Sequence, residues 1–234
     1  MKIALLGYGK MGKAIEKIAC ERGHEITAIQ DPNTTKGTLE NADVAINFSV
    51  PDAAVENIKS ALDISIPVIC GTTGWLDRKD EVIAYCHRKE AAFLYASNFS
   101  VGVNLFFALN QKLATLMQNH PNYSVSLEEI HHIHKLDAPS GTALSLVEDI
   151  IEASTYQSWT LGEHTKQRLQ IPIHSIREGE VPGTHSVTYQ NTVDSIRIQH
   201  QAFNRNGFAL GAVIAAEWIV GKKGVFSMTD VLNL

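Results

Sequence analysis

Cysteine is scarce and scattered in this sequence. The three cysteines, Cys20, Cys70 and Cys86, lie far apart among 234 residues and form no Cys-x-x-Cys pair. An odd number of isolated cysteines argues against a disulfide framework or a cysteine-based zinc site, and it is typical of a reducing compartment. We therefore expect a cytoplasmic protein.

A surplus of positive charge is also missing. The 20 Lys and Arg residues are outnumbered by 25 Asp and Glu residues, which gives a formal net charge of -5. A chain with this charge does not attract nucleic acid or an anionic membrane as a whole. Any anion that it binds must be held by a local cluster, so we expect a small molecule rather than nucleic acid as its partner.

Long apolar runs are absent as well. The two most apolar stretches, residues 101–117 and 207–221, are interrupted by polar residues such as Asn104 and Glu217. Neither reaches the roughly 20 apolar residues of a membrane span, and the N-terminal residues lack the pattern of a signal peptide. With 44% hydrophobic and 19% charged residues, the composition is that of a globular protein with a core, and we expect no membrane partner.

The first hundred residues alternate regularly between short apolar runs and amphipathic stretches. Apolar runs that stop at glycine or polar residues indicate buried strands, and stretches with a 3.6-residue period indicate helices. Strands that alternate with helices predict an α/β domain with a Rossmann-like, doubly wound parallel sheet. The expected strands are residues 2–6, 25–30, 43–48, 67–70 and 92–96, and the expected helices are residues 11–22, 51–63 and 77–89.

The pattern changes after Asn98. A long helix and then several strand-like segments predict an α+β second domain with a mostly antiparallel or mixed open sheet. We expect the tail to be helical and to pack on the first domain, which then comprises residues 1–100 and 206–234, with residues 101–205 as the second domain. The expected second-domain helices are residues 101–118 and 141–153, and the strands are residues 123–133, 171–177, 184–191 and 194–202.

A glycine-rich loop joins the first expected strand to the first expected helix. The first glycine of such a loop permits a tight turn, the second lets a pyrophosphate approach the backbone, and the third lets helix and strand pack closely. The motif alone is compatible with an ordinary turn, but its position between strand and helix favours dinucleotide binding. The loop consists of Gly7, Tyr8, Gly9, Lys10, Met11 and Gly12.

Asp31 ends the second expected strand, where an acidic residue accepts hydrogen bonds from ribose hydroxyls. A carboxylate there repels a 2′-phosphate, and the neighbouring Pro32 carries no charge, although Lys10 or Lys36 would be able to compensate. We therefore expect NADH or NADPH as the cofactor, with a preference for NADH.

Turns follow the third, fourth and fifth expected strands. In open α/β sheets, ligands lie beyond the carboxyl ends of the strands, so these turns are further candidates for cofactor binding. Each turn alone is equally compatible with a plain connection, and only their joint placement favours a ligand site. The candidates are Phe48, Ser49, Gly71, Thr72, Thr73, Ala96, Ser97, Asn98 and Phe99.

Residues 128–144, EEIHHIHKLDAPSGTAL, place three histidines and a lysine before a Pro-Ser-Gly-Thr turn. Neighbouring residues of a strand point to opposite faces, so a strand here places His131 with Glu129 and away from His132 and His134. This division, and the lack of a nearby cysteine or a helical HExxH pattern, argue against a metal site. We expect no metal, and the remaining alternatives are a solvent-facing polar strand and a proton-transfer site.

The turn after the histidines favours proton transfer. Ser140 is a suitable N-cap for an apolar helix, so Gly141 and Thr142 occupy the first helical turn, where free N–H groups and the helix dipole bind anions. Lys135 precedes this cap, and the adjacent histidines, His131 among them, can move protons near neutral pH. These features suggest a two-domain enzyme that transfers hydride to an electron-poor C=N or C=C bond and protonates the resulting anion.

The string HHIHKLDAPSGTA, together with GYGKMG, GTTG, SNFSVGVN, RNGFALGA and TDVLNL, resembles the dihydrodipicolinate reductase family over nearly the whole chain. The resemblance implies NAD(P)H-dependent reduction of 4-hydroxy-tetrahydrodipicolinate in diaminopimelate and lysine biosynthesis, by a homotetramer joined through the second-domain sheet. It implies that His131 and Lys135 are catalytic proton donors or acceptors. It also implies that His132, Ser140, Gly141 and Thr142 hold a cyclic dicarboxylate, and that the first-domain motifs hold the dinucleotide.

One departure and two other interpretations accompany this resemblance. Pro32 stands where many relatives carry an arginine, which weakens the case for NADPH. A different Rossmann-type amino-acid dehydrogenase shares the same general features and has to be separated by its substrate. A non-catalytic NADH-binding redox sensor needs a DNA-binding or docking element, and the sequence shows neither a basic helix nor a spare domain.

Overall fold

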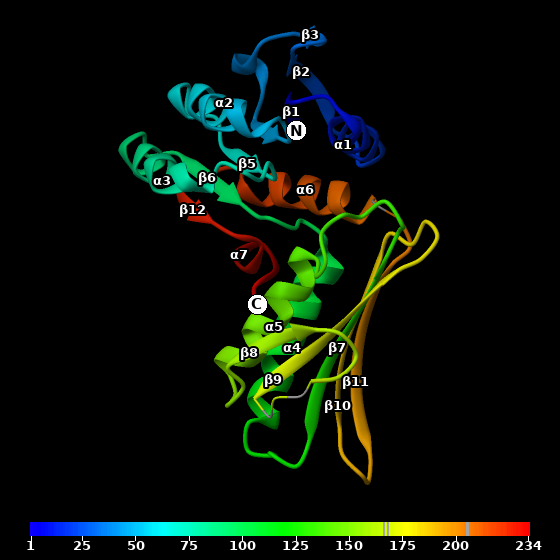
Figure 1. Ribbon diagram of the computed structural model, residues 1–234. Coiled ribbons are helices and arrows are strands. Elements are labelled where there is room, and N and C mark those ends of the chain that lie inside the picture. Colours follow the sequence, from blue (N-terminus) through cyan, green and yellow to red (C-terminus); the bar gives the residue numbers. More distant parts are fainter. Residues whose placement is uncertain (166, 168, 205) are drawn as a thin grey trace. The chain divides into compact units, whose positions relative to one another are not determined.

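The computed structural model describes residues 1–165, 167, 169–204 and 206–234. The chain divides into two compact units, which are Met1–Asn104 with Asn206–Leu234, and Leu105–Arg205. Residue 205, the first of the RNGFALGA stretch, lies outside the described residues. Figure 1 shows the elements of both units.

A seven-stranded sheet forms the first unit, in the strand order β12-β6-β5-β4-β1-β2-β3. Neighbouring strands are parallel except β2 and β3, which are antiparallel. This arrangement confirms the predicted α/β fold. The strands are β1 (Lys2–Leu6), β2 (Glu25–Asp31), β3 (Thr34–Lys36), β4 (Val44–Asn47), β5 (Val68–Cys70), β6 (Ala92–Tyr95) and β12 (Gly224–Phe226), and the helices are α1 (Lys10–Glu21), α2 (Pro51–Asp63), α3 (Lys79–Arg88), α6 (Asn206–Ile219) and α7 (Met228–Leu232).

The first unit has an apolar core on each face of its sheet. Ile3 and Leu5 of β1 belong to the core beneath α1 and α6, whereas Ala4 and Leu6 belong to the core beneath α2 and α3. Figure 1 shows these two pairs of helices on opposite sides of the sheet. Because both faces are covered, the strands are apolar throughout, which is why they appear in the sequence as continuous apolar runs.

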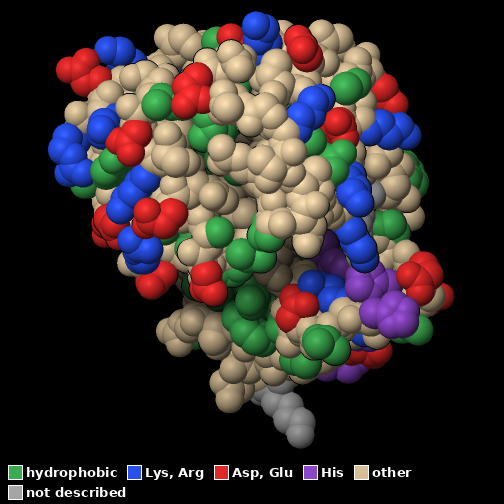
Figure 2. Space-filling view, turned by 90° about the horizontal axis from the view of Figure 1, so that it is seen from above, with side chains coloured by type: hydrophobic (Ala, Val, Ile, Leu, Met, Phe, Trp, Pro, Cys, Tyr) green, Lys and Arg blue, Asp and Glu red, His purple; other side chains and the backbone are tan. Residues whose placement is uncertain are grey.

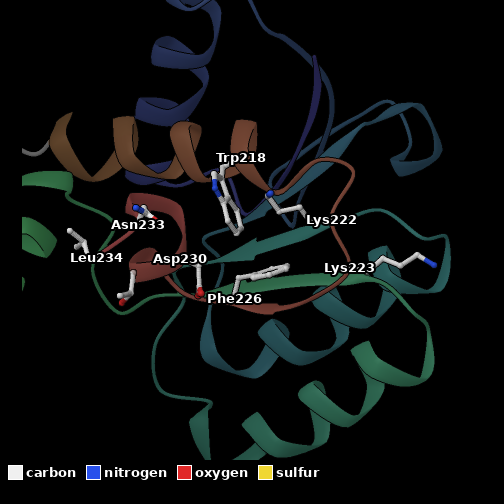
Figure 3. A pocket seen from close by; sticks show the side chains of 8 residues that line it. Trp218, Lys222, Lys223, Phe226, Asp230, Asn233 and Leu234 are labelled. Carbon is white, nitrogen blue, oxygen red and sulfur yellow. The ribbon is translucent and has the colours of Figure 1, made fainter.

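The sequence predicted a helical tail, but the tail also contains a strand. Residues 224–226 form β12, which pairs in parallel with the edge strand β6. The segment is too short for a helix, and the open edge of β6 offers hydrogen-bond partners for its backbone. Trp218 of α6 and Phe226 of β12 meet edge to face with 5.0 Å between ring centroids, and both line a cavity of about 470 Å³ beside α7 (Figure 3).

A five-stranded sheet forms the second unit, in the order β11-β10-β7-β9-β8. It is a mixed sheet, because β10 is antiparallel to β7 and β11, whereas β9 is parallel to β7 and β8. The elements are α4 (Val101–Met117), β7 (Ser124–His131), α5 (Gly141–Glu152), β8 (Ser158–Leu161), β9 (Gln170–Arg177), β10 (Gly183–Gln190) and β11 (Ser195–Ala202).

Only one face of the second sheet carries a helical layer among the described elements. Leu127 of β7 and Val187 of β10 pack with residues of α4 and α5 in a single apolar cluster. The burial of β7 alternates along the strand accordingly. Among the described residues, no helix combines the length and hydropathy that crossing a membrane would need.

Candidate functional site

The turns predicted to bind a cofactor all lie at one edge of the first unit's sheet. They follow β1, β2, β4, β5 and β6, which form a continuous run of neighbouring parallel strands. Because parallel strands end in the same direction, their carboxyl ends meet at the edge where ligands bind in open α/β sheets. The residues brought there are Gly7, Tyr8, Gly9, Lys10, Met11, Gly12, Asp31, Phe48, Ser49, Gly71, Thr72, Thr73, Ala96, Ser97, Asn98 and Phe99.

The three glycines of the loop after β1 have different surroundings. Gly7 has a φ of +96°, and a Cβ on it would lie 2.3 Å from the carbonyl oxygen of Phe48. A Cβ on Gly12 would lie 2.5 Å from the carbonyl oxygen of Gly7, whereas one on Gly9 would meet no atom within 4 Å. The fold therefore requires Gly7 and Gly12, while Gly9 leaves open space at the start of α1. That space fits a pyrophosphate on the helix N-terminus.

Asp31 is hydrogen-bonded to the same loop. Its carboxylate accepts from the backbone N–H of Tyr8 at 2.9 Å and from that of Asn33 at 3.0 Å. The Tyr8 N–H, followed by the Asn33 N–H, lowers the pKa of Asp31 below its ordinary value, so the side chain is ionised at neutral pH. Lys36 donates to the carbonyl of Ile26 at 3.3 Å, so this possible partner of a 2′-phosphate is already engaged by the backbone.

The turns after β4, β5 and β6 contact one another. The backbone N–H of Ser49 donates to the hydroxyl of Thr72 at 2.9 Å. The rings of Phe48 and Phe99 lie 5.6 Å apart, and a Cβ on Gly71 would lie 2.2 Å from the ring of Phe48. A ligand at this edge therefore meets a surface that is already formed.

In the second unit, the histidine stretch is not a strand along its whole length. β7 ends at His131, and a turn follows in which Lys135 N–H donates to the carbonyl of His132 at 3.1 Å. The prediction of a strand to residue 133 is therefore wrong, because the turn takes the backbone of residues 132–135 out of the sheet. The rings of His132 and His134 lie 6.1 Å apart, but on the turn and not on one face of a strand. The chain leaves the sheet directly after His131.

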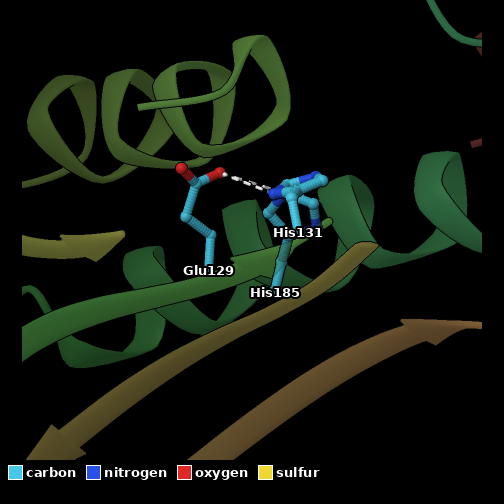
Figure 4. Close-up of side chains that lie close together, drawn as sticks. All are labelled: Glu129, His131 and His185. Atoms are coloured by element: carbon cyan, nitrogen blue, oxygen red, sulfur yellow. Dashed lines mark ion pairs between the residues drawn. The ribbon is translucent and has the colours of Figure 1, made fainter. Parts of the chain in front are cut away.

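His131 lies in a buried cluster with Glu129 and His185 (Figure 4). Its Nδ1 is 3.3 Å from Oε2 of Glu129, and its ring centroid is 5.0 Å from that of His185. The alternation of β7 predicts that Glu129 and His131 share a face, and the structure shows this. His185 joins them because the register of β10 places it opposite Glu129.

Glu129 is the most connected member of the cluster. Its side chain is 0% exposed, and its carboxylate accepts from the backbone N–H of Ser140 at 3.1 Å and from Arg177 at 3.0 Å. Burial alone would raise the pKa of Glu129, but the close contact with His131 and hydrogen bonds from Ser140 and Arg177 hold that pKa well below its ordinary value. Glu129 is therefore a fixed negative charge at neutral pH.

His185 is a neutral member of the same cluster. Burial, followed by the neighbouring His131, lowers the pKa of His185 to about 3. Its Nε2 shares a hydrogen bond with the hydroxyl of Ser140 at 3.1 Å. The same hydroxyl accepts from the N–H of Ala143 at 3.2 Å and so caps α5, as the sequence predicted for Ser140.

The ligand atoms of Glu129, His131 and His185 lie within 4.8 Å of one another, which is close enough for a metal ion. However, a cation beside Glu129 would meet the guanidinium of Arg177, which lies 3.0 Å from the other carboxylate oxygen. The Ser140 N–H also occupies this carboxylate. The donor set is therefore better suited to orienting His131 than to holding a metal.

Lys135 and the start of α5 lie on either side of a short loop. The ammonium of Lys135 donates to both oxygens of Asp137, at 2.7 and 2.8 Å, and chiefly through this contact lowers the pKa of Asp137. A Cβ on Gly141 would meet no atom within 4 Å, so the first turn of α5 with Thr142 is open to a ligand. Backbone N–H groups at this turn have no partner within the helix and attract anions.

Three residues of this arrangement were not singled out as site residues in the sequence. Glu129 carried a local signal, because it shares the face of His131. Arg177 and His185 carried none, since only the pairing of β9 and β10 with β7 brings them there. Figure 2 shows histidine side chains gathered in one group on the visible face, while acidic and basic side chains are interspersed over the rest.

Comparisons with known proteins agree over the whole chain. The model of the N-terminus of dihydrodipicolinate reductase matches residues 1–99, and the model of its C-terminus matches residues 102–232. A 4-hydroxy-tetrahydrodipicolinate reductase of Christiangramia forsetii is 52% identical over 100% of this chain and 98% of its own length. One of Methanoculleus marisnigri is 39% identical over 100% of both chains.

Among solved structures, the fold is similar to that of a dipicolinate-bound dihydrodipicolinate reductase from Paenisporosarcina sp. TG-14. The TM-score is 0.78 at 22% identity, and the match covers 97% of each chain. At this identity the structural match supports the fold, and the sequence matches support the family. The chain belongs to the dihydrodipicolinate reductase family.

Proposed function

We propose that this protein is an NAD(P)H-dependent oxidoreductase that converts 4-hydroxy-tetrahydrodipicolinate to tetrahydrodipicolinate in diaminopimelate and lysine biosynthesis. The observation that carries the proposal is family membership over both units. It is supported by the buried acid–base cluster of Glu129, His131 and His185 close to the start of α5.

The chemistry sets what the protein must supply. The reaction replaces the 4-hydroxyl group with hydrogen in two steps. Water is first lost, which leaves a conjugated C=C–C=N system, and a hydride and a proton are then added to that system. The bound dinucleotide supplies the hydride. The carboxyl edge of the first unit's sheet holds it in this proposal, with Gly9 at the pyrophosphate and Asp31 at the ribose.

The second unit is the substrate-binding unit of the proposal. His131 gives or takes a proton, and Glu129 orients its ring through Nδ1. Lys135 is the second proton donor, and its ammonium releases Asp137 to bind a substrate carboxylate. The substrate's dicarboxylate is further held by His132, Ser140, Gly141 and Thr142 at the N-terminus of α5.

Finer features belong to the same proposal. The ionised Asp31 and the uncharged Pro32 favour NADH over NADPH. Within the described ranges of the chain, one face of the second sheet has no helical layer, and such a face suits a homotetramer. The isolated cysteines suit the cytoplasm. Sedimentation of the purified protein tests the tetramer, and a monomer would contradict it.

The decisive experiment follows NADH consumption with 4-hydroxy-tetrahydrodipicolinate generated in situ. We expect turnover with this substrate and none with a panel of amino acids and their oxo acids. Turnover only with the panel would identify another amino-acid dehydrogenase. NADH binding without turnover on any substrate would instead favour a redox sensor, and either result would overturn the proposal.

A further inference from the structure

Arg177 is a partly buried cation that the proposed chemistry does not use directly. It ends β9, opposite His131 of β7, and its side chain is 20% exposed. Its guanidinium donates to the carboxylate of Glu129 at 3.0 Å and to the carbonyls of Lys135 at 3.3 Å and Asp137 at 2.5 Å. These acceptors all belong to the protein, so the group serves the architecture of the site.

The two carbonyls lie in the loop between β7 and α5, whose residues belong to neither a strand nor a helix. A planar guanidinium with five donors can hold several acceptors in one fixed geometry, which an ammonium cannot do. Arg177 therefore fixes the backbone at Lys135 and at Asp137. The carboxylate of Asp137 in turn accepts hydrogen bonds from the Lys135 ammonium.

Glu129, which accepts from Arg177, also contacts the start of α5. The carboxylate of Glu129 accepts from Arg177 and also from the N–H of Ser140, the N-cap of α5. The loop that carries Lys135 is therefore held through Arg177, and the N-terminus of α5 directly, by the same buried carboxylate of Glu129. Charge-assisted hydrogen bonds of this kind are stronger and more directional than neutral ones.

We infer that Arg177 is a positioning residue: anchored on Glu129, it sets the separation between the ammonium of Lys135 and the amides at the start of α5. The inference rests on the proposed function, because that separation matters only if both groups bind one dicarboxylate. It predicts that loss of the guanidinium impairs substrate binding and turnover together but leaves the dinucleotide edge intact. Small misplacements of such groups cost about 10²-fold in rate.

The test compares Arg177→Met with Arg22→Met in the full-length protein. Arg22 donates from Nε and Nη2 to the carboxylate of Glu217 in the first unit, both at 2.8 Å, so its loss also breaks an Arg–Glu pair. For Arg177→Met we expect KM for the substrate to rise about tenfold and kcat to fall about tenfold, a drop of about 10²-fold in kcat/KM. The dissociation constant for NADH should stay within about twofold, and Arg22→Met should change neither kcat nor KM.

A chemical rescue separates positioning from a general structural role. In Arg177→Ala, millimolar guanidinium should restore about tenfold in kcat/KM, and sodium chloride at equal ionic strength should not. If Arg177→Met does not fold, Arg177→Lys replaces it, with the same pattern expected because one ammonium cannot reach all these acceptors. A folded variant with kcat/KM within about threefold of wild type, or no rescue by guanidinium, overturns the inference.

Binding of pyridine-2,6-dicarboxylate keeps the inference testable apart from turnover. Calorimetry should show affinity about tenfold weaker in Arg177→Met than in wild type. If the wild type lacks turnover, the proposed function fails, while equal affinity of both proteins for this dicarboxylate overturns the role of Arg177.

Discussion

The two candidate sites of this chain are built in different ways. The dinucleotide edge of the first unit consists mainly of backbone, with glycines at fixed offsets and turns after successive parallel strands. The histidine site of the second unit is a buried network of side chains from β7, β9, β10 and the loop before α5. The difference teaches that a backbone-built site depends on local spacing, whereas a network of side chains depends on strand register.

We expect the largest loss of activity when Lys135 is replaced. Lys135→Ala should lower kcat by about 10³- to 10⁴-fold, because it removes both a proton donor and the charge that holds a carboxylate. The NADH dissociation constant, measured by fluorescence, should not change. Turnover near the wild-type level would show that Lys135 has no catalytic role. It would also contradict the view that side chains of the second unit carry the chemistry.

Loss of His131 should come next. His131→Ala should slow catalysis by about 10²- to 10⁴-fold, the range for a general acid–base group. Because its Nδ1 faces Glu129 at 3.3 Å, His131→Gln, which lacks the imidazole, should be slowed by a similar factor. Steady-state kinetics check both variants, and full activity in either would exclude the proton-transfer role.

The backbone-built site is best probed with two glycines. Gly12→Ala should lower the unfolding midpoint and weaken NADH binding more than tenfold, because its Cβ would lie 2.5 Å from the carbonyl oxygen of Gly7. Gly9→Ala should weaken NADH binding by a similar factor and leave the midpoint unchanged, because its Cβ meets no protein atom within 4 Å. Thermal melts and NADH titrations of both variants check this. Normal NADH binding in Gly9→Ala would show that the pyrophosphate lies elsewhere.

The burial of His185 predicts how the stability of the protein depends on pH. Burial lowers the pKa of His185 from its ordinary 6.5 to about 3, so between these values the unfolded chain binds a proton that the folded chain does not. Stability should therefore fall as pH drops through this window, by up to about 1.4 kcal/mol per pH unit from this group. His185→Asn should reduce the slope of unfolding free energy against pH between pH 6.5 and 5.

Urea titrations across that range provide the measurement. Below this range, Glu129 acts in the same direction, because its folded pKa lies below its ordinary 4.5 and its stabilisation is lost as pH falls. An unchanged slope between pH 6.5 and 5 in His185→Asn would show that the folded protein accepts this proton readily.

The smallest effect concerns the choice of dinucleotide. Asp31→Ala should weaken NADH binding by about three- to tenfold, the value of a lost hydrogen bond or two, and should raise the relative affinity for NADPH. Asp43→Ala is the matched control, because Asp43 also accepts from a backbone N–H, that of Lys2 at 2.7 Å, at the other end of the sheet. An unchanged ratio of NADPH to NADH affinity would contradict the role of Asp31.

The sequence supported the prediction of the first unit better than that of the second. The strands β1, β2, β4, β5 and β6 were predicted from continuous apolar segments, which arise because both faces of that sheet are covered. The short strands β3, β8 and β12 were missed, because each lies at the edge of its sheet and none is a continuous apolar run as β5 is. The strand through the histidines was extended too far, because its alternation continued past the turn that ends β7.

By itself, the sequence determined the order of the buried strands and the long helices, the glycine loop with Asp31 after β2, and the cap of α5 at Ser140. These depend on periodicity, backbone freedom and capping, which act over a few neighbouring residues. Only the tertiary structure decided that Glu129 meets Arg177, 48 positions away, and that His185 lies opposite Glu129. The register of β7 with β9 and β10 makes those contacts, and register is set by how whole strands bury their apolar faces against α4 and α5.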